Sequence, residues 1–335
     1  MRKIYTSLSY LVLSLFLFSS LISCKNDKEA EPVADVETIP AEDQERFFKI
    51  SLAQWSLSKP IMEGKMDPMD FAEKANEMGF DGIEYVSSLY GLKYQNAVDP
   101  KAALAGVLDT LKAKSEEFGV ENVLIMVDGE GDLATPNEED RKKAVENHKK
   151  WVDAAQFLGA HSIRVNLFGS TDPEEWKNTS IQGLTELGDY AATKDINVIV
   201  ENHGYLSSNA ELLAQVMEGV NKPNVGTLPD FGNFCLKREG GTQWEAACIE
   251  EYPKYQGVKE LMPYAKGVSA KSYAFGEDGQ ETTIDFAKML QIVKEAGYNG
   301  YIGIEFEGQG MSAEEGILAT KELLIKEGNK LSSPN

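Results

Sequence analysis

The 335-residue chain is short of positive charge and of histidine. Its 33 lysines and arginines stand against 54 aspartates and glutamates, a formal net charge of −21. Such a surface repels phosphate backbones, which excludes nucleic acid as the expected partner. Only three histidines are present, and His203 alone follows the carboxyl end of a predicted strand. A multinuclear zinc centre built from several histidines is therefore excluded.

The first stretch, residues 1–23, has the features of an export signal. Arg2 and Lys3 precede an apolar run at 11–17, which is short for a membrane-spanning helix. The sequence LISC, ending at Cys24, resembles the lipobox of bacterial lipoproteins, whose cysteine becomes the acylated N-terminus. We expect a lipid anchor on Cys24 that holds the exported protein on the cell envelope, at the periplasmic face or the outer-membrane surface. The alternative is an uncleaved membrane anchor.

Residues 24–46 are acidic, rich in alanine, proline and glutamate, and without apolar periodicity, which predicts a flexible tether. Residues 47–331 suit one large α/β domain. Two further cysteines, Cys235 and Cys248, lie in this domain. In an exported protein they can form a disulfide, and two free buried thiols are the alternative that the sequence leaves open.

Strand-like and helix-like segments alternate from Phe48 to the C-terminus. Helical spacing is seen, for example, at Phe286, Met289, Leu290 and Val293. The strands are continuous apolar runs, which is typical of a parallel sheet buried on both faces. They read ISLAQW, GIEYV, VENVLIMV, SIRVNL, NVIVEN, VGTLPD, GVSAKS and YIGIEF.

One junction recurs between helices and strands. Gly79, Gly119, Gly159 and Gly297 each stand between two apolar residues at the end of a helical segment. Glycine at this place fits the left-handed position that ends a helix. The repetition favours a single (β/α)8 TIM barrel. A doubly wound open sheet is the alternative, and no glycine-rich phosphate loop supports it.

Three carboxylates mark matching points of three predicted strands: Glu201, Asp230 and Glu305. In a (β/α)8 barrel these points face the same end, so the three side chains should converge. Converging oxygen ligands can hold a hard divalent cation. A purely structural role would need a cation beside them, which Lys271 or Arg164 could supply.

Other residues at the same strand ends are candidates for binding a substrate. Lys271 is a candidate for proton transfer, with a salt bridge as the alternative. Trp55 could equally pack in the barrel, and His203 could merely support a neighbouring side chain. The predicted substrate-binding set is Trp55, Glu84, Asn166, His203, Asn233 and Ser269.

The runs VIVENHG, TLPDFGNF, GVSAKSY and GYIGIEFEG resemble the xylose isomerase-like TIM-barrel superfamily, over roughly residues 48–331. This group holds sugar isomerases and epimerases and also endonuclease IV. The resemblance implies that Glu201, Asp230 and Glu305 bind one metal and that the two glutamates form an acid–base pair. The histidine-rich zinc site of endonuclease IV cannot be built here.

Two histidines of the family pattern are replaced in this chain. The histidine on strand seven is Ser269, and the Asp-x-x-His motif after strand six ends in Asn233. Oxygen-bearing groups at both places favour a harder ion, Mg²⁺ or Mn²⁺, and loss of the metal is the alternative.

The function expected from the resemblance is a metal-dependent sugar isomerase or epimerase that abstracts a proton next to a carbonyl. Export favours a non-phosphorylated sugar or keto-sugar, because phosphorylated sugars are largely retained in the cytoplasm. The alternatives are a 3-keto-glycoside lyase or hydratase using the same chemistry, and a non-catalytic carbohydrate-binding lipoprotein. The sequence leaves the sugar and the oligomeric state open.

Overall fold

The computed structural model describes residues 46–244 and 246–332. The predictions for the signal peptide, for Cys24 and for nearly all of the tether lie outside the described residues. Within those residues, none of the helices is both long and apolar enough to cross a membrane.

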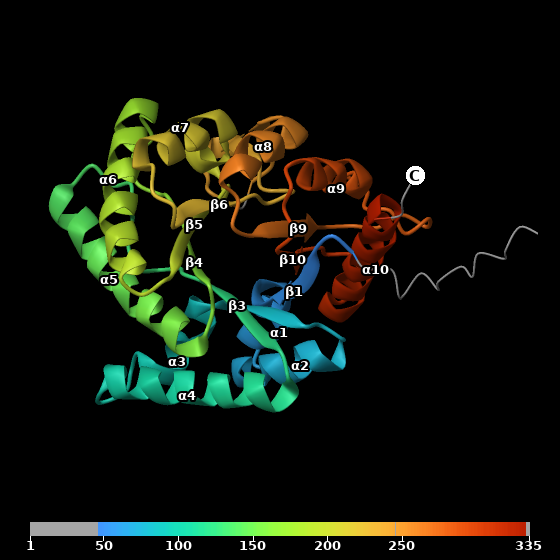
Figure 1. Cartoon of the computed structure of the whole chain (residues 1–335), viewed down its shortest axis with the longest axis horizontal. Coiled ribbons are helices and arrows are strands. Elements are labelled where there is room, and N and C mark those ends of the chain that lie inside the picture. The colour runs from blue at the N-terminus through green and yellow to red at the C-terminus, as the bar shows by residue number, and fades with distance from the viewer. Residues whose placement is uncertain (1–45, 245, 333–335) are drawn as a thin grey trace, which may run out of the picture. The chain divides into compact units, whose positions relative to one another are not determined.

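Eight parallel strands form one sheet in the order β6-β5-β4-β3-β2-β1-β10-β9 (Figure 1). Parallel bridges pair Thr227 with Ala265 and Asp230 with Ser269, which closes the sheet between its two ends. The TIM barrel is confirmed and the open sheet is excluded. The strands are β1 (Lys49–Ala53), β2 (Gly82–Val86), β3 (Glu121–Met126), β4 (Ser162–Val165), β5 (Asn197–Glu201), β6 (Val225–Leu228), β9 (Val268–Ser272) and β10 (Tyr301–Phe306).

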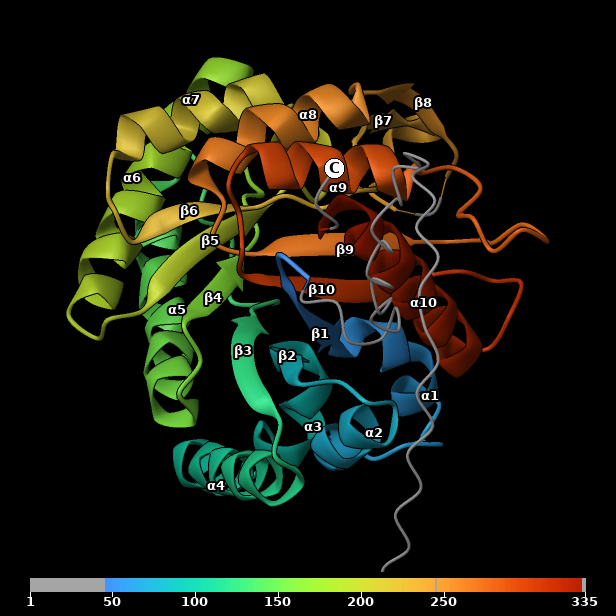
Figure 2. The same cartoon turned by 45° about the vertical axis from the view of Figure 1, so that its right-hand side comes forward.

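Helices surround these strands, as both views show (Figures 1 and 2). They are α1 (Ser58–Met62), α2 (Phe71–Glu77), α3 (Gly91–Tyr94), α4 (Pro100–Phe118), α5 (Glu138–Leu158), α6 (Pro173–Ala192), α7 (Ala210–Val220), α8 (Lys254–Leu261), α9 (Phe286–Glu295) and α10 (Ala313–Ser332). Short 3₁₀ helices cover Gln54–Leu57, Pro68–Asp70, Ser87–Tyr90, Tyr205–Ser208, Glu239–Gly241 and Met262–Tyr264.

Local chemistry sets where the longer helices begin and end. The Asp99 carboxylate accepts the first free amides of α4, and Pro100 occupies the first helical position. Asn137 caps α5 and Asp172 caps α6 in the same way. The four glycines predicted to end helices all have φ between +65° and +77°, which confirms the repeated junction.

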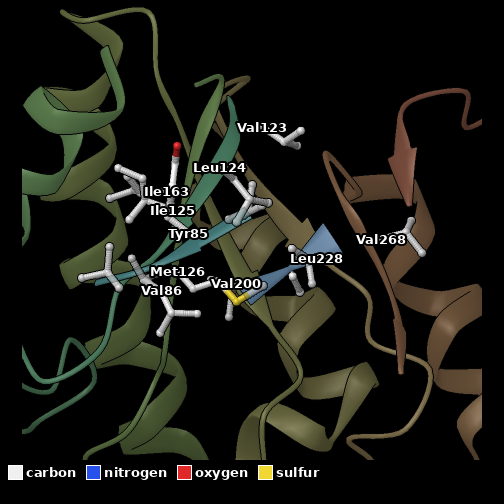
Figure 3. Packing of buried hydrophobic residues seen from close by; sticks show 14 of the residues in the cluster. Tyr85, Val86, Val123, Leu124, Ile125, Met126, Ile163, Val200, Leu228 and Val268 are labelled. Atoms are coloured by element: carbon white, nitrogen blue, oxygen red, sulfur yellow. The ribbon is translucent and has the colours of Figure 1, made fainter. Parts of the chain in front are cut away.

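The core lies between the strands and the helices, with further side chains inside the barrel. Figure 3 shows part of it, including Leu124, Ile163, Val200 and Leu228. The apolar residues predicted for α9 are all fully buried. Burial of each aliphatic side chain of this size contributes about 1.5–3 kcal/mol. Because the eight buried strands are parallel, their carboxyl ends all lie at the same end of the barrel.

One element was not predicted. The chain segment that leads from β6 to α8 contains an antiparallel hairpin, formed by strands β7 (Cys235–Arg238) and β8 (Cys248–Glu251) and drawn beside α8 in Figure 2. A disulfide joins Cys235 to Cys248 across the pair. This confirms the disulfide. The alternative of two free buried thiols is wrong on both points, because the two sulfur atoms are bonded and Cys248 is exposed.

Candidate active site

The three predicted carboxylates meet at the carboxyl ends of their strands. Glu201 ends β5, Asp230 follows β6 and Glu305 lies near the end of β10. Each is at most 3% exposed, and one oxygen of each lies within 4.8 Å of the others. We call this set the carboxylate trio.

Two buried cations contact the trio. Arg164 comes from β4, and its Nε lies 3.0 Å from Glu201 Oε2. The two groups are not aligned for a hydrogen bond, so the contact is an ion pair. Lys271 is the register partner of Glu305 on the neighbouring strand, and its Nζ lies 3.1 Å from Glu305 Oε2. The same ammonium lies 3.2 Å from Glu307. The cations that a structural role would require are therefore both present.

Asp230 is held by hydrogen bonds instead. Its Oδ1 accepts the backbone amides of Gly232 and Asn233, both at 2.8 Å. The Ser269 hydroxyl lies 2.5 Å from Asp230 Oδ2 and 3.3 Å from Glu305 Oε2, so it bridges two carboxylates. Asn233 also donates its side-chain amide to Glu201 Oε1 at 2.9 Å. These contacts fix the orientation of all three carboxylates.

The environments of the trio push its pKa values apart. Burial is the largest cause that raises the pKa of Glu305 to about 8, against the attraction of Lys271. Burial likewise raises the pKa of Asp230 to about 6. Burial acts in the same sense on Glu201, but the nearby cations Arg164 and Lys271 hold its pKa below the usual value. Two carboxyl groups with such different environments suit the two roles of an acid–base pair.

A cavity of about 1450 Å³ opens at this end of the barrel. The predicted site residues in its lining are Trp55, Asn166, His203, Asn233 and Glu305. Glu305 is thus the one member of the trio in this lining. The other predicted site residues are outside it and at most 2% exposed: Glu201, Asp230, Glu84, Ser269 and Lys271. The Glu84 carboxylate accepts from Ser51 Oγ at 2.6 Å instead.

His203 belongs to a chain of hydrogen bonds on one wall of the cavity. Asn166 donates its amide to Asp128 at 2.8 Å, so its oxygen is left to accept from His203 Nδ1 at 2.7 Å. His203 therefore carries its proton on Nδ1 and leaves Nε2 as an acceptor. Burial lowers the pKa of His203 and favours the neutral ring. Arg164 anchors the far end of this chain by pairing with Asp128 at 2.9 Å.

Sequence reasoning missed several members of the site. Asp128, Glu307 and Trp244 are not among the residues predicted from the sequence. Asp128 directly follows the β3 run, which was an available signal. Trp244 had a weaker signal, since it lies between the two cysteines in a connection longer than a βα unit requires.

The trio could hold a metal ion. Its donors are carboxylate oxygens, and Ser269 adds a hydroxyl where the family pattern has a nitrogen ligand. Hard cations with oxygen ligands fit this set.

Residues 72–327 match the family described as xylose isomerase-like TIM barrel, so the chain belongs to that family. An inosose isomerase of Bacillus licheniformis is 24% identical over 204 residues, which cover 57% of this chain and 70% of that protein. An inosose dehydratase of Geobacillus thermodenitrificans is 28% identical over 148 residues, 40% of this chain and 48% of that protein. The chain thus spans about half the length of this second relative.

Solved structures agree on the fold. The E. coli 3-keto-D-glucoside 4-epimerase YcjR has a TM-score of 0.60 at 16% identity, covering 78% of this chain and 94% of that one. The IOLI protein with a bound zinc atom has a TM-score of 0.59 at 16% identity, over 84% and 99%. A Mycobacterium smegmatis protein of this fold, in complex with magnesium, has a TM-score of 0.58 at 17% identity, over 88% and 100%.

Proposed function

We propose that this protein is a sugar isomerase or epimerase that moves a proton at a carbon next to a carbonyl. The observation that carries the proposal is the meeting of Glu201 and Glu305 in one small buried volume, from strands that are not neighbours in the barrel. The relatives named as an inosose isomerase and as sugar epimerases support this class of reaction.

The two glutamates differ in the way that the reaction requires. Glu201, with its pKa held down, is ionised and accepts the proton from the substrate carbon. Glu305 faces the same small volume from β10 and is the second group placed to exchange a proton with the resulting enediolate; without a bound cation, burial raises its pKa to about 8. Donation to the opposite face of the same carbon gives epimerisation, and donation to the neighbouring carbon gives isomerisation. Lys271 stays an ammonium beside Glu305 and holds that carboxyl group in place.

A divalent cation completes the proposed site. Glu201, Asp230 and Glu305 would hold it, and Mg²⁺ or Mn²⁺ fits their oxygen donors. When bound, the cation supplies polarisation of the substrate carbonyl. The chain itself orients the three ligands through Arg164, Asn233 and Ser269.

The lining favours an uncharged sugar over a phosphorylated one. Its cationic side chains largely have partners already: Lys65 with Glu63 (2.6 Å), Lys74 with Glu314 (2.9 Å) and Arg164 with Asp128 (2.9 Å). Arg238 donates to backbone carbonyls, and Lys59 is exposed. The described lining therefore offers no cluster of unpaired cations for a phosphate group.

A lyase is the second candidate. The inosose dehydratase relatives favour it. If the carbon beside the carbanion carries a leaving group, the electron pair expels it with a proton, and the net reaction is elimination. A 3-keto-glycoside lyase or hydratase would use the same residues.

Deuterium exchange from solvent into a panel of keto-sugars and keto-glycosides, followed by NMR, tests the proposal. The native protein should exchange the proton next to the carbonyl. Glu201→Gln and Glu305→Gln should each slow exchange by roughly 10²-fold or more, because each removes an acid–base group. Glu314→Gln is the matched control, since Glu314 is an exposed carboxylate of the same cavity. Near-native exchange in both site variants would overturn the mechanism and favour a carbohydrate-binding protein.

A further inference from the structure

The connection between β7 and β8 brings an aromatic side chain to the mouth of the cavity. The Trp244 indole packs against the His203 imidazole, with ring centres 4.7 Å apart and planes tilted by 37°. Phe168 meets the same indole edge-on, with ring centres 6.1 Å apart. All three side chains line the cavity. Trp244 is still 40% exposed, so a large aromatic surface remains accessible.

The position of Trp244 is braced from several sides. Arg238 donates from Nε to the Gln243 carbonyl at 3.1 Å and from Nη1 to the Ala246 carbonyl at 2.8 Å. These two carbonyls stand on either side of Trp244 in the chain. The Cys235–Cys248 disulfide closes the base of the same hairpin. These contacts support the chain just before and just after Trp244.

A glycine permits the indole to approach the barrel. Gly204 follows His203 and has φ of +85°, where side chains are rarely accommodated. A Cβ at this position would lie 3.3 Å from the edge of the Trp244 ring. The backbone after β5 and the hairpin thus fit together closely, although they belong to different connections of the barrel.

The cavity is also larger than one sugar ring requires. Its volume of about 1450 Å³ exceeds the roughly 300–1,000 Å³ usual for a small-molecule site. Glu305 and Trp244 both contribute to its lining, and His203 connects the indole to the segment that directly follows Glu201. A single sugar ring at the trio would fill only part of a cavity of this volume.

We propose that Trp244 is the stacking platform of a second sugar subsite, so that the substrate is a glycoside. One ring reaches the carboxylate trio, and the neighbouring ring places its apolar face on the indole. The identity of the reacting ring rests on the proposed function, whereas the subsite is a statement about binding and can be tested without turnover.

Calorimetric titration tests the second sugar subsite separately from the proposed catalytic function. The probes are the 3-keto derivatives of glucose and of the disaccharides cellobiose, maltose and trehalose. At least one disaccharide should bind about ten-fold or more tightly than 3-keto-glucose, the scale of an aromatic anchor. Trp244→Ala should abolish that preference while leaving the affinity for 3-keto-glucose within about two-fold of native, and Trp244→Phe should restore part of it. Ile249→Ala is the control, since Ile249 is exposed on the same hairpin and outside the lining.

Equal affinity for mono- and disaccharides in the native protein, or no binding of any disaccharide in the millimolar range, overturns the subsite. If Trp244→Ala lowers the affinity for monosaccharides and disaccharides equally, the subsite is also overturned, because the indole would then support the whole site. Solvent exchange measured on the same samples reports on the proposed function alone. A preserved disaccharide preference without exchange would refute the catalytic proposal and leave the subsite standing.

Discussion

Replacing Glu84 by glutamine should change how the stability of the barrel depends on pH. Glu84 lies in β2, is 2% exposed, and has one oxygen, Oε2, buried without a hydrogen-bond partner. Burial is the largest cause that raises the pKa of Glu84 to about 7, and the negative charge of Glu201 raises it further. The hydrogen bond from Ser51 acts in the opposite direction. Ionising this group inside the folded barrel is therefore costly.

The magnitude follows from the difference between the folded and unfolded states. In the unfolded chain the Glu84 pKa is near its ordinary value of 4.5, against about 7 when folded. Below pH 4.5 both states are protonated, and Glu84 has no pH-dependent effect. As pH rises from 4.5 to 7 the unfolded chain loses the proton first, so the free energy of unfolding falls. The loss is complete above pH 7 and amounts to roughly 3 kcal/mol.

Urea unfolding of native protein and Glu84→Gln, at several pH values from 4.5 to 8 in chelator, measures this contribution. As pH rises across that range, the free energy of unfolding of the variant should increase by about 3 kcal/mol relative to that of the native protein. Burying the new amide adds a cost that is equal at every pH, so the change with pH is diagnostic. Glu314→Gln, at an exposed carboxylate, should follow the native curve. Parallel curves for native protein and Glu84→Gln would refute the reasoning.

Three further predictions follow from the site and the N-terminal motif. Chelation should stop solvent exchange and Mg²⁺ or Mn²⁺ should restore it, whereas stoichiometric zinc in the purified protein would contradict the preference for a hard cation. Lys271→Met should lower the free energy of unfolding by about 3–5 kcal/mol in urea titrations, because Glu305 and Glu307 lose a buried partner; a loss below about 1 kcal/mol would argue against the pairing. We also propose that Cys24 carries the lipid anchor, so Cys24→Ala should move the protein from the membrane to the soluble fraction, and continued pelleting with membranes would contradict it.

The sequence predicted the barrel because its strands carry a strong physical signal. A strand buried on both faces must be apolar along its length. Seven of the eight predicted runs contain their observed strand, and the eighth misses only Lys49 at the start of β1. The β7–β8 hairpin escaped because its residues are exposed or half-buried and show no apolar pattern. The pair Cys235 and Cys248 was its one available signal, and spacing alone could not decide whether the two thiols bond.

The trio was predictable because topology alone brings strand ends together. Glu84 shows the limit of that rule: it is the third of five residues in β2, whereas Glu201 is the last residue of β5. A side chain in mid-strand points into the barrel below the mouth. The pairing of Arg164 with Glu201 depends on the reach of a long side chain across neighbouring strands, which sequence spacing does not encode.

The charge balance of the trio links its stability to its proposed chemistry. The ligand oxygens of the trio lie within 4.8 Å of one another, and two ionised carboxylates at that distance repel by roughly 3–4 kcal/mol at an effective dielectric constant of 20. Arg164 and Lys271 offset this repulsion at Glu201 and Glu305, while Asp230 relies on two amides and a hydroxyl. A divalent cation therefore competes with the protein's own cations for two of its three ligands. We accordingly expect this trio to bind metal more weakly than one without such cations, and Asp230 to gain most from the added charge.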